Sequence, residues 1–169
     1  MTGETAAVTI RPAGRSDMAA VAIMAGEFHA FLAAMDHSDP AFDVARTERT
    51  LCRFGFGKKP LFSALIAEGS GAPVGYAIYS IGFWADSFQG VVFLTDLFVR
   101  EAFRSRGIGR RLMGRLAAIG REQGCEIVLW TVWDRNQAAE CFYERLGTTP
   151  MPDKKLMKWP ISPREGLSG

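Results

Sequence analysis

The stretch Arg100-Glu-Ala-Phe-Arg104-Ser-Arg106-Gly107-Ile108-Gly109-Arg110-Arg111 decides the fold, because it joins two strongly patterned segments. Residues 91–99 before it are apolar almost throughout, as expected for a central strand covered on both faces. Residues 107–123 carry apolar side chains at helical spacing, and Gly124 suits a left-handed C-terminal cap. Glycines let the backbone approach a ligand, and a helix start offers free N–H groups and a favourable dipole to anions. The stretch therefore predicts a pyrophosphate site.

The positive charge of this region is local. Residues 100–121 contain seven arginines and one glutamate, a net charge of +6 in a chain whose formal total is +2. The alternative interpretation is a tight helix start that carries a solvated arginine face. Because the whole chain has no global basic field, we expect no nucleic acid and no membrane among its partners.

The composition fits one globular domain of 169 residues, 48% hydrophobic and 22% charged. No repeat or linker divides the chain, so we expect a single domain over 1–160 and a disordered tail over 161–169. Cys52, Cys125 and Cys141 fit no disulfide framework, zinc site or redox motif, which favours a reducing compartment. We find no targeting segment and no run of about 18 apolar residues, and expect a soluble cytoplasmic protein without a metal.

Hydrophobic periodicity predicts alternating strands and helices. Ser16 and Asp17 are good N-cap types for a first helix, and Asn136 and Gly147 suit the start and the end of a last one. Helices are expected over 18–35, 43–56, 107–123 and 136–146. Strands are expected over 6–11, 61–67, 74–83, 91–99, 126–132 and 154–159.

The glycine motif separates several classes of phosphate-binding protein. A dinucleotide fingerprint G-x-G-x-x-G is excluded because Leu112 stands at the third glycine, and the G-K-[ST] ending of a Walker loop is missing. What remains, Arg104-x-x-Gly107-x-Gly109, resembles the acyl-coenzyme A signature [QR]-x-x-G-x-[GA] of the GNAT N-acetyltransferase superfamily. The buried strand before it, and the helix, strand and Asn-started helix after it, have the order of that family.

The resemblance covers nearly the whole chain and is nearest to the spermidine/spermine and thialysine N-acetyltransferase branch. It implies an α/β (α+β) GNAT fold with a mixed, mostly antiparallel sheet of six to seven strands, splayed at the acyl-CoA site and flanked by about four helices. It also implies acetyl-CoA as cosubstrate and a homodimer. The matching segments are 10–13, 55–57 before Pro60, 65–68, 97–99, 104–109, Asn136 and Phe142-Tyr143.

The same resemblance assigns the residues that hold acetyl-CoA. Backbone groups of Leu97, Phe98 and Val99 would hold the acetyl and pantetheine end. The motif loop would hold the pyrophosphate, and the start of the last helix would line the other side of the cofactor. The loop residues are Arg104, Ser105, Arg106, Gly107, Ile108, Gly109 and Arg110, and the helix residues are Asn136, Gln137, Ala138 and Ala139.

Acetyl transfer to an amine needs an uncharged amine, a donor for the developing oxyanion, and an acid for the leaving thiolate. Tyr143 matches the position of the family's acid, and a phenol can deliver a proton. The alternative is that Tyr143 is a core residue like its neighbour Phe142.

The general base departs from the family pattern. The resembled branch reads L-E-D in the central strand, and its glutamate takes the amine proton through water, whereas this chain has Leu94-Thr95-Asp96. A threonine hydroxyl is no general base near neutral pH, so Asp96 substitutes, Thr95 orders a water, or the proton leaves by another path. In a regular strand Asp96 faces away from Thr95, and a β-bulge would re-aim it. Alternative acceptors on or near the first helix are Glu27, His29 and Asp36.

The acceptor side also departs from a polyamine enzyme. Residues 41–60 hold five basic and two acidic side chains, a local charge of +3. This charge repels spermidine and favours an amine that also carries a carboxylate, unless the side chains point away from the pocket. Phe83 and Trp84 are candidates for an apolar acceptor wall, and equally for core or dimer contacts.

The sequence thus predicts an acetyl-CoA-dependent N-acetyltransferase that acts on a small primary amine, either amino-acid-like or a diamine, by direct transfer in a ternary complex. Two alternatives stay open. One is a protein or peptide N-acetyltransferase. The other is a catalytically degenerate acyl-CoA-binding regulator, which the threonine at position 95 motivates.

Overall fold

The computed structural model describes residues 8–161. They form two compact units, the first ending at Arg135 and the second beginning at Asn136. The expected tail lies outside the described residues apart from Ile161, and so do the first residues of the strand expected over 6–11. The expectation of one domain over 1–160 stays a prediction.

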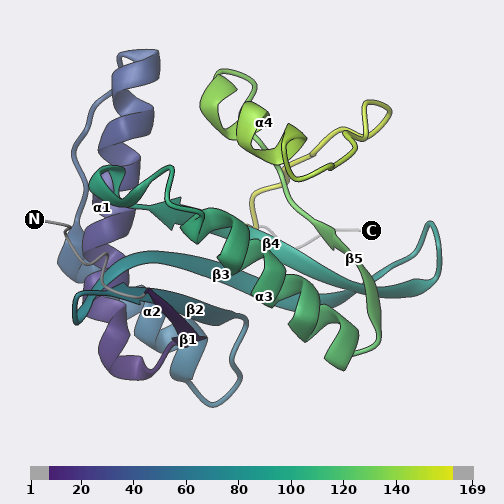
Figure 1. The fold of residues 1–169 in the computed structure, drawn as a ribbon, viewed down its shortest axis with the longest axis horizontal. Helices are drawn as coiled ribbons and strands as arrows, with labels where there is room; N and C mark the ends of the chain where they lie inside the picture. Colours follow the sequence, from purple (N-terminus) through teal and green to yellow (C-terminus); the bar gives the residue numbers. More distant parts are fainter. Residues whose placement is uncertain (1–7, 162–169) are drawn as a thin grey trace, which may run out of the picture. The chain divides into compact units, whose positions relative to one another are not determined.

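The first unit is built on a five-stranded sheet in the order β1-β2-β3-β4-β5 (Figure 1). The first four strands are antiparallel neighbours, and β5 runs parallel to β4. The mixed, mostly antiparallel sheet is confirmed, whereas the expected count of six to seven strands is too high for the described residues. The strands are β1 Thr9–Pro12, β2 Ser63–Gly69, β3 Ala72–Trp84, β4 Gln89–Val99 and β5 Cys125–Leu129.

The strand expected over 154–159 is wrong. These residues are irregular, and Leu156, Met157 and Trp159 are largely exposed. A strand needs a neighbouring edge to hydrogen-bond its backbone, and the only regular element described in the second unit is the helix α4. The segment 154–159 therefore has no strand to pair with inside its own unit.

The four expected helices are confirmed, and three of them, α1, α2 and α3, cover the two faces of the sheet. On one face α1 and α2 enclose a core with β2, β3 and β4, and on the other face α3 packs its buried stripe of Ile108, Leu112 and Leu116. Figure 1 shows α3 crossing the near face of the sheet. The helices are α1 Met18–Asp36, α2 Val44–Phe56, α3 Ile108–Glu122 and, in the second unit, α4 Gln137–Glu144.

Helix α1 has an unusually apolar composition. Residues Arg15–Asp36 are long and apolar enough to cross a membrane by length and composition, contrary to the expectation that no such run exists. In the structure one side of α1 packs against the sheet, and 28% of the apolar window is buried. The buried cluster consists of Met18, Val21, Met24, Ile66, Tyr76 and Phe98.

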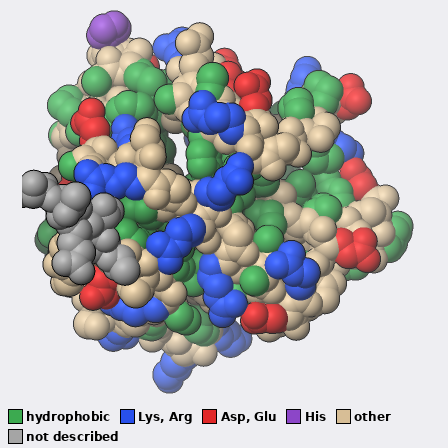
Figure 2. All heavy atoms as spheres, viewed as in Figure 1, with side chains coloured by type: hydrophobic (Ala, Val, Ile, Leu, Met, Phe, Trp, Pro, Cys, Tyr) green, Lys and Arg blue, Asp and Glu red, His purple; other side chains and the backbone are tan. Residues whose placement is uncertain are grey.

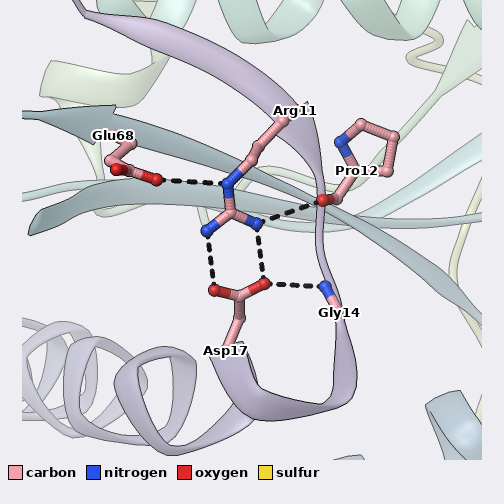
Figure 3. A network of polar contacts seen from close by, with 5 residues as sticks. All are labelled: Arg11, Pro12, Gly14, Asp17 and Glu68. Carbon is pink, nitrogen blue, oxygen red and sulfur yellow. Dashed lines mark hydrogen bonds and ion pairs between the residues drawn. The ribbon is translucent and has the colours of Figure 1, made fainter. Parts of the chain in front are cut away.

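A polar network fixes the entry into α1 (Figure 3). Arg11 of β1 donates to both carboxylate oxygens of Asp17 at 2.8 and 2.9 Å and to Glu68 of β2 at 3.1 Å. Asp17 also accepts from the Gly14 N–H at 2.7 Å, so its side chain closes the preceding 3-10 turn and does not cap α1 as expected. The hydrogen bond from Arg11 is the main reason that the pKa of Asp17 lies below its ordinary value.

Candidate functional site

The sheet opens between β4 and β5. The parallel pairing ends at Phe93 with Leu129, while β4 continues to Val99 with β3 as its neighbour on the other side. Within the described residues of the first unit, the outer edge of Leu97–Val99 therefore pairs with no strand. Such an edge presents backbone N–H and C=O groups to a ligand that carries amide groups. The splay expected at this point is confirmed.

The loop after β4 leads this open edge into the start of α3. Ser105 and Gly107 both have left-handed backbones, with φ of 61° and 76°, and Gly107 is the N-cap of α3. The first hydrogen bond of the helix runs from the Arg111 N–H to the Gly107 carbonyl at 3.0 Å. The N–H groups of Ile108 and Gly109 precede it and have no acceptor inside the helix, which is the arrangement that suits a phosphate.

The side chains of the two arginines nearest β4, Arg100 and Arg104, contact other residues of the protein. Arg100 forms an ion pair with Glu27 of α1 at 2.9 Å and donates to the Pro73 carbonyl at 3.2 Å. Arg104 donates to the Val99 carbonyl at 2.9 Å, and its guanidinium lies 5.2 and 5.7 Å from the ring centres of Phe31 and Phe98. These contacts position the loop against α1 and β4.

The remaining arginines follow α3. Figure 2 shows Lys and Arg side chains gathered across the face where α3 lies. Arg106 stacks on Phe103 at 5.4 Å, and Arg115 pairs with Glu122 at 3.1 Å. Arg110 and Arg111 are exposed in the first turn of the helix. The local positive charge predicted from the sequence thus lies beside the N–H groups of the helix start.

Strand β4 contains a β-bulge at the departure from the family pattern. Ile78 pairs with Asp96 while Tyr79 pairs with Leu94, so Thr95 is the extra residue. The Thr95 hydroxyl donates to the Ile78 carbonyl at 3.0 Å and thereby supports the bulge. The bulge that the sequence analysis required to re-aim Asp96 is confirmed, since Asp96 shares the α1 face of the sheet with its cross-strand partner Ile78.

The Asp96 carboxylate is largely buried and receives neutral hydrogen-bond donors. Its Oδ2 accepts from the Tyr76 hydroxyl at 2.6 Å, and no ion pair to Asp96 is found among residues 8–161. Burial raises the pKa of Asp96, while the hydrogen bonds from Tyr76 and the Leu97 N–H act in the opposite direction. Burial, followed by the charge of Asp96, also raises the pKa of Tyr76. A partly exposed carboxylate with a raised pKa is a suitable proton acceptor.

The other candidate proton acceptors lie on α1 in different environments. Glu27 is paired with Arg100, as described above. The Nδ1 atom of His29 is buried without a hydrogen-bond partner, and its ring lies 5.3 Å from that of Phe42. Asp36 accepts from the Ser38 N–H at 3.0 Å near the end of the helix, and hydrogen bonds from Ser38 lower its pKa.

The second unit holds the remaining predicted residues. The Asn136 side chain accepts from the Ala139 N–H at 3.1 Å, so the predicted N-cap of α4 is confirmed. Tyr143 is half-buried, and its ring lies edge-on to that of Phe142 at 5.0 Å. Gly147 has a φ of 78°, as expected for the residue that closes the helix. The assignment of Tyr143 as the acid stays a prediction.

The basic segment around α2 is exposed. Arg46, Arg49 and Arg53 recur at helical spacing, and none of them forms an ion pair within the described part of the chain. Arg46 lines a depression at the start of α2, together with Ala41, Phe42, Asp43, Thr47, Thr50 and Leu51. The two aromatic candidates for an acceptor wall lie in different environments. Trp84 packs edge-on against Phe93, whereas Phe83 is 61% exposed.

Comparison with known proteins decides the family. The model of the acetyltransferase (GNAT) family matches residues 28–148. The chain belongs to the acetyltransferase (GNAT) family. As a GNAT protein with N-acetyltransferases among its relatives, it is an acetyl-CoA-dependent N-acetyltransferase. The predicted branch is confirmed, because relatives of this chain are named thialysine N-epsilon-acetyltransferases.

Individual relatives of this GNAT chain cover most of its length. The thialysine N-epsilon-acetyltransferase of Mus musculus is 30% identical over 159 residues, 89% of this chain and 89% of the relative. The L-methionine sulfoximine/L-methionine sulfone acetyltransferase of Salmonella typhimurium is 28% identical over 160 residues, covering 90% and 89%. A solved aminoglycoside N-acetyltransferase in complex with CoA superposes with a TM-score of 0.73 at 16% identity, covering 95% of this chain and 99% of that one. It therefore shares the fold.

Tyr76 is a candidate functional residue that was not predicted from the sequence. It lies inside a predicted strand of mixed apolar residues, where nothing distinguishes it from a packed aromatic. Only the register of β3 against the bulged β4 places its hydroxyl on Asp96.

Proposed function

We propose that this protein transfers the acetyl group of acetyl-CoA to the primary amine of a small amino-acid-like molecule, by direct transfer in a ternary complex. The observation that carries the proposal is one continuous element: the unpaired edge of β4 runs directly into the phosphate-binding start of α3, and the same strand bears Asp96. We further propose a cytoplasmic homodimer.

The residues present fit acetyl-CoA. The outer edge of Leu97–Val99 offers backbone partners for the amides of pantetheine, and the N–H groups of Ile108 and Gly109 suit the pyrophosphate. The coenzyme supplies an acetyl group already activated as a thioester. Arg104 contributes by holding the loop to Val99, and the backbone of the start of α4 lines the cofactor in this proposal.

Two residues divide the proton transfers. Asp96 takes the proton from the ammonium group of the acceptor, since its carboxylate is the only charged group on β4 and has no cationic partner within the described residues. The Thr95 hydroxyl donates to a backbone carbonyl, so it supports the bulge and accepts no amine proton. Tyr143 protonates the departing thiolate, which keeps the leaving group neutral.

The acceptor carries a carboxylate as well as the amine. The relatives named above act on thialysine and on derivatives of L-methionine, which supports an amino-acid framework. The unpaired, exposed arginines of α2 favour a negatively charged group at the acceptor side and disfavour a polycation such as spermidine.

The test is a measurement of CoA release with a thiol reagent, using acetyl-CoA and a panel of amino acids, thialysine, polyamines and short peptides. Turnover on zwitterionic amines that is lost in both Tyr143→Phe and Asp96→Asn, but kept in the matched control Tyr79→Phe, is the expected result. Efficient turnover of spermidine contradicts the charge argument, and preferred turnover of peptides contradicts the small-molecule acceptor.

A regulatory function is the second candidate, because Thr95 stands where the resembled branch has its catalytic glutamate. Tight binding of acetyl-CoA in a calorimetric titration, without turnover on any amine of the panel, would identify the protein as an acyl-CoA-binding regulator.

A further inference from the structure

We propose that Tyr76 is a positioning residue that fixes the Asp96 carboxylate as the proton acceptor, an inference that rests on the proposed N-acetyltransferase function. The Tyr76 hydroxyl donates to Asp96 Oδ2 at 2.6 Å across two neighbouring strands. This length is typical of a strong hydrogen bond from a hydroxyl to a carboxylate. No other hydrogen-bond partner of the Tyr76 hydroxyl is found within residues 8–161, so no other group competes for this bond.

The position of the hydroxyl is fixed by packing. Tyr76 has no exposed surface, and its ring centre lies 6.0 Å from that of Phe98. The ring belongs to the buried cluster between α1 and the sheet, defined above. Because close-packed interiors leave little room for other rotamers, the Tyr76 hydroxyl stays on Asp96 Oδ2 and restricts the orientation of the carboxylate.

The bulge at Thr95 creates this pair. Without the extra residue, position 96 would fall on the α3 face of the sheet, among the apolar side chains of the other core. With the bulge, Asp96 lies opposite Ile78, and the side chain two residues earlier on β3 is Tyr76. The bulge at Thr95 and the tyrosine on β3 are therefore parts of one arrangement.

Stability alone gives no reason to keep this pair. A largely buried carboxylate without a cation is destabilising, and exchanging a buried polar pair for apolar side chains of similar shape is often neutral or stabilising. An arrangement that orients a carboxylate for proton transfer does require the hydroxyl, because the hydrogen bond fixes its geometry and favours its ionised form.

The charged groups around Asp96 determine the direction of the pH effect. Glu27 of α1 contributes a negative charge near Tyr76 and is itself paired with Arg100. Arg104 lies over the neighbouring Phe98 ring. Against this fixed background, removal of the Tyr76 hydroxyl takes away a donor to the carboxylate and therefore raises the pKa of Asp96.

The experiment compares Tyr76→Phe with Tyr79→Phe, which removes the hydroxyl of a tyrosine on the other face of the same strand. In Tyr76→Phe the acidic limb of the pH profile of kcat shifts to higher pH by about one unit, which is about a tenfold loss of kcat at a given pH on that limb. The value of kcat recovers at high pH, and the Kd for acetyl-CoA stays unchanged. Tyr79→Phe keeps the wild-type limb.

A carbon-13 NMR titration of the Asp96 carboxyl, assigned with Asp96→Asn, measures the same shift without turnover. An unmoved carboxyl titration in Tyr76→Phe overturns the proposal, and so does a uniform loss of kcat at every pH. A wild-type protein that turns over no amine overturns the proposed function instead, and the carboxyl titration then still shows whether Tyr76 sets the ionisation of Asp96.

Discussion

Gly107 and Gly114, at the start and inside α3, allow a test of the proposed backbone phosphate site. Gly107 has a φ of 76° at the N-cap of α3, whereas Gly114 lies inside the helix. A Cβ added at either position meets no atom within 4 Å, so lack of space does not distinguish them. Any difference between Gly107→Ala and Gly114→Ala therefore reports backbone conformation.

The expected effects have opposite signs. Gly114→Ala replaces glycine with the best helix former and should stabilise the fold by about 0.8–1 kcal/mol, which raises Tm by about 2–4 °C. Gly107→Ala forces an L-residue into the left-handed region at a cost of about 1–2 kcal/mol. The chain relieves this strain by turning the loop, which moves the N–H groups of Ile108 and Gly109 away from a bound phosphate.

The assay combines thermal unfolding with calorimetric titration of acetyl-CoA. Loss of one hydrogen bond to a charged phosphate is worth about 1.5–3 kcal/mol, so the Kd of Gly107→Ala should rise at least about tenfold. Gly114→Ala should bind acetyl-CoA like the wild type. Wild-type affinity in Gly107→Ala would refute the assignment of the phosphate site to these backbone groups.

Three further predictions concern the fold and the proposed base. Arg11→Met removes the guanidinium that pairs with both Asp17 and Glu68, and it should destabilise the protein by about 1 kcal/mol after allowance for solvent screening. Because the pKa of folded Asp17 is lowered, this loss should be complete at pH 7 and fade as the pH falls below about 4, as urea unfolding at several pH values can check. Gly75→Ala places a Cβ 2.8 Å from the Phe98 carbonyl oxygen, so urea unfolding should show a loss of about 2 kcal/mol; an unchanged midpoint would contradict the close approach of β3 and β4. Asp96→Asn should raise Tm at pH 7. The pKa of Asp96 is raised in the folded state, so its ionisation destabilises the folded protein at high pH and has no such effect at low pH. A lower Tm of Asp96→Asn in calorimetry at pH 7 would contradict this.

The local elements follow from the sequence because their signals are short-range. The apolar residues of 91–99, the helical spacing after Gly107 and the capping side chain of Asn136 each depend on neighbours a few positions away. The structure accordingly reproduces the central strand, the helices and the left-handed Gly124 and Gly147. The same signals failed for 154–159, where a strand needs a distant partner.

The sequence by itself determined the fold class and the glycine-initiated start of α3, and it supplied the candidate residues of the site, since these reside in contiguous motifs. The tertiary structure alone decided which face Asp96 occupies, that Thr95 supports the bulge, and that Tyr76 donates to the carboxylate. The reason is register: a one-residue shift between strands reverses the face of every later side chain, and it is set by cross-strand packing that no local pattern encodes.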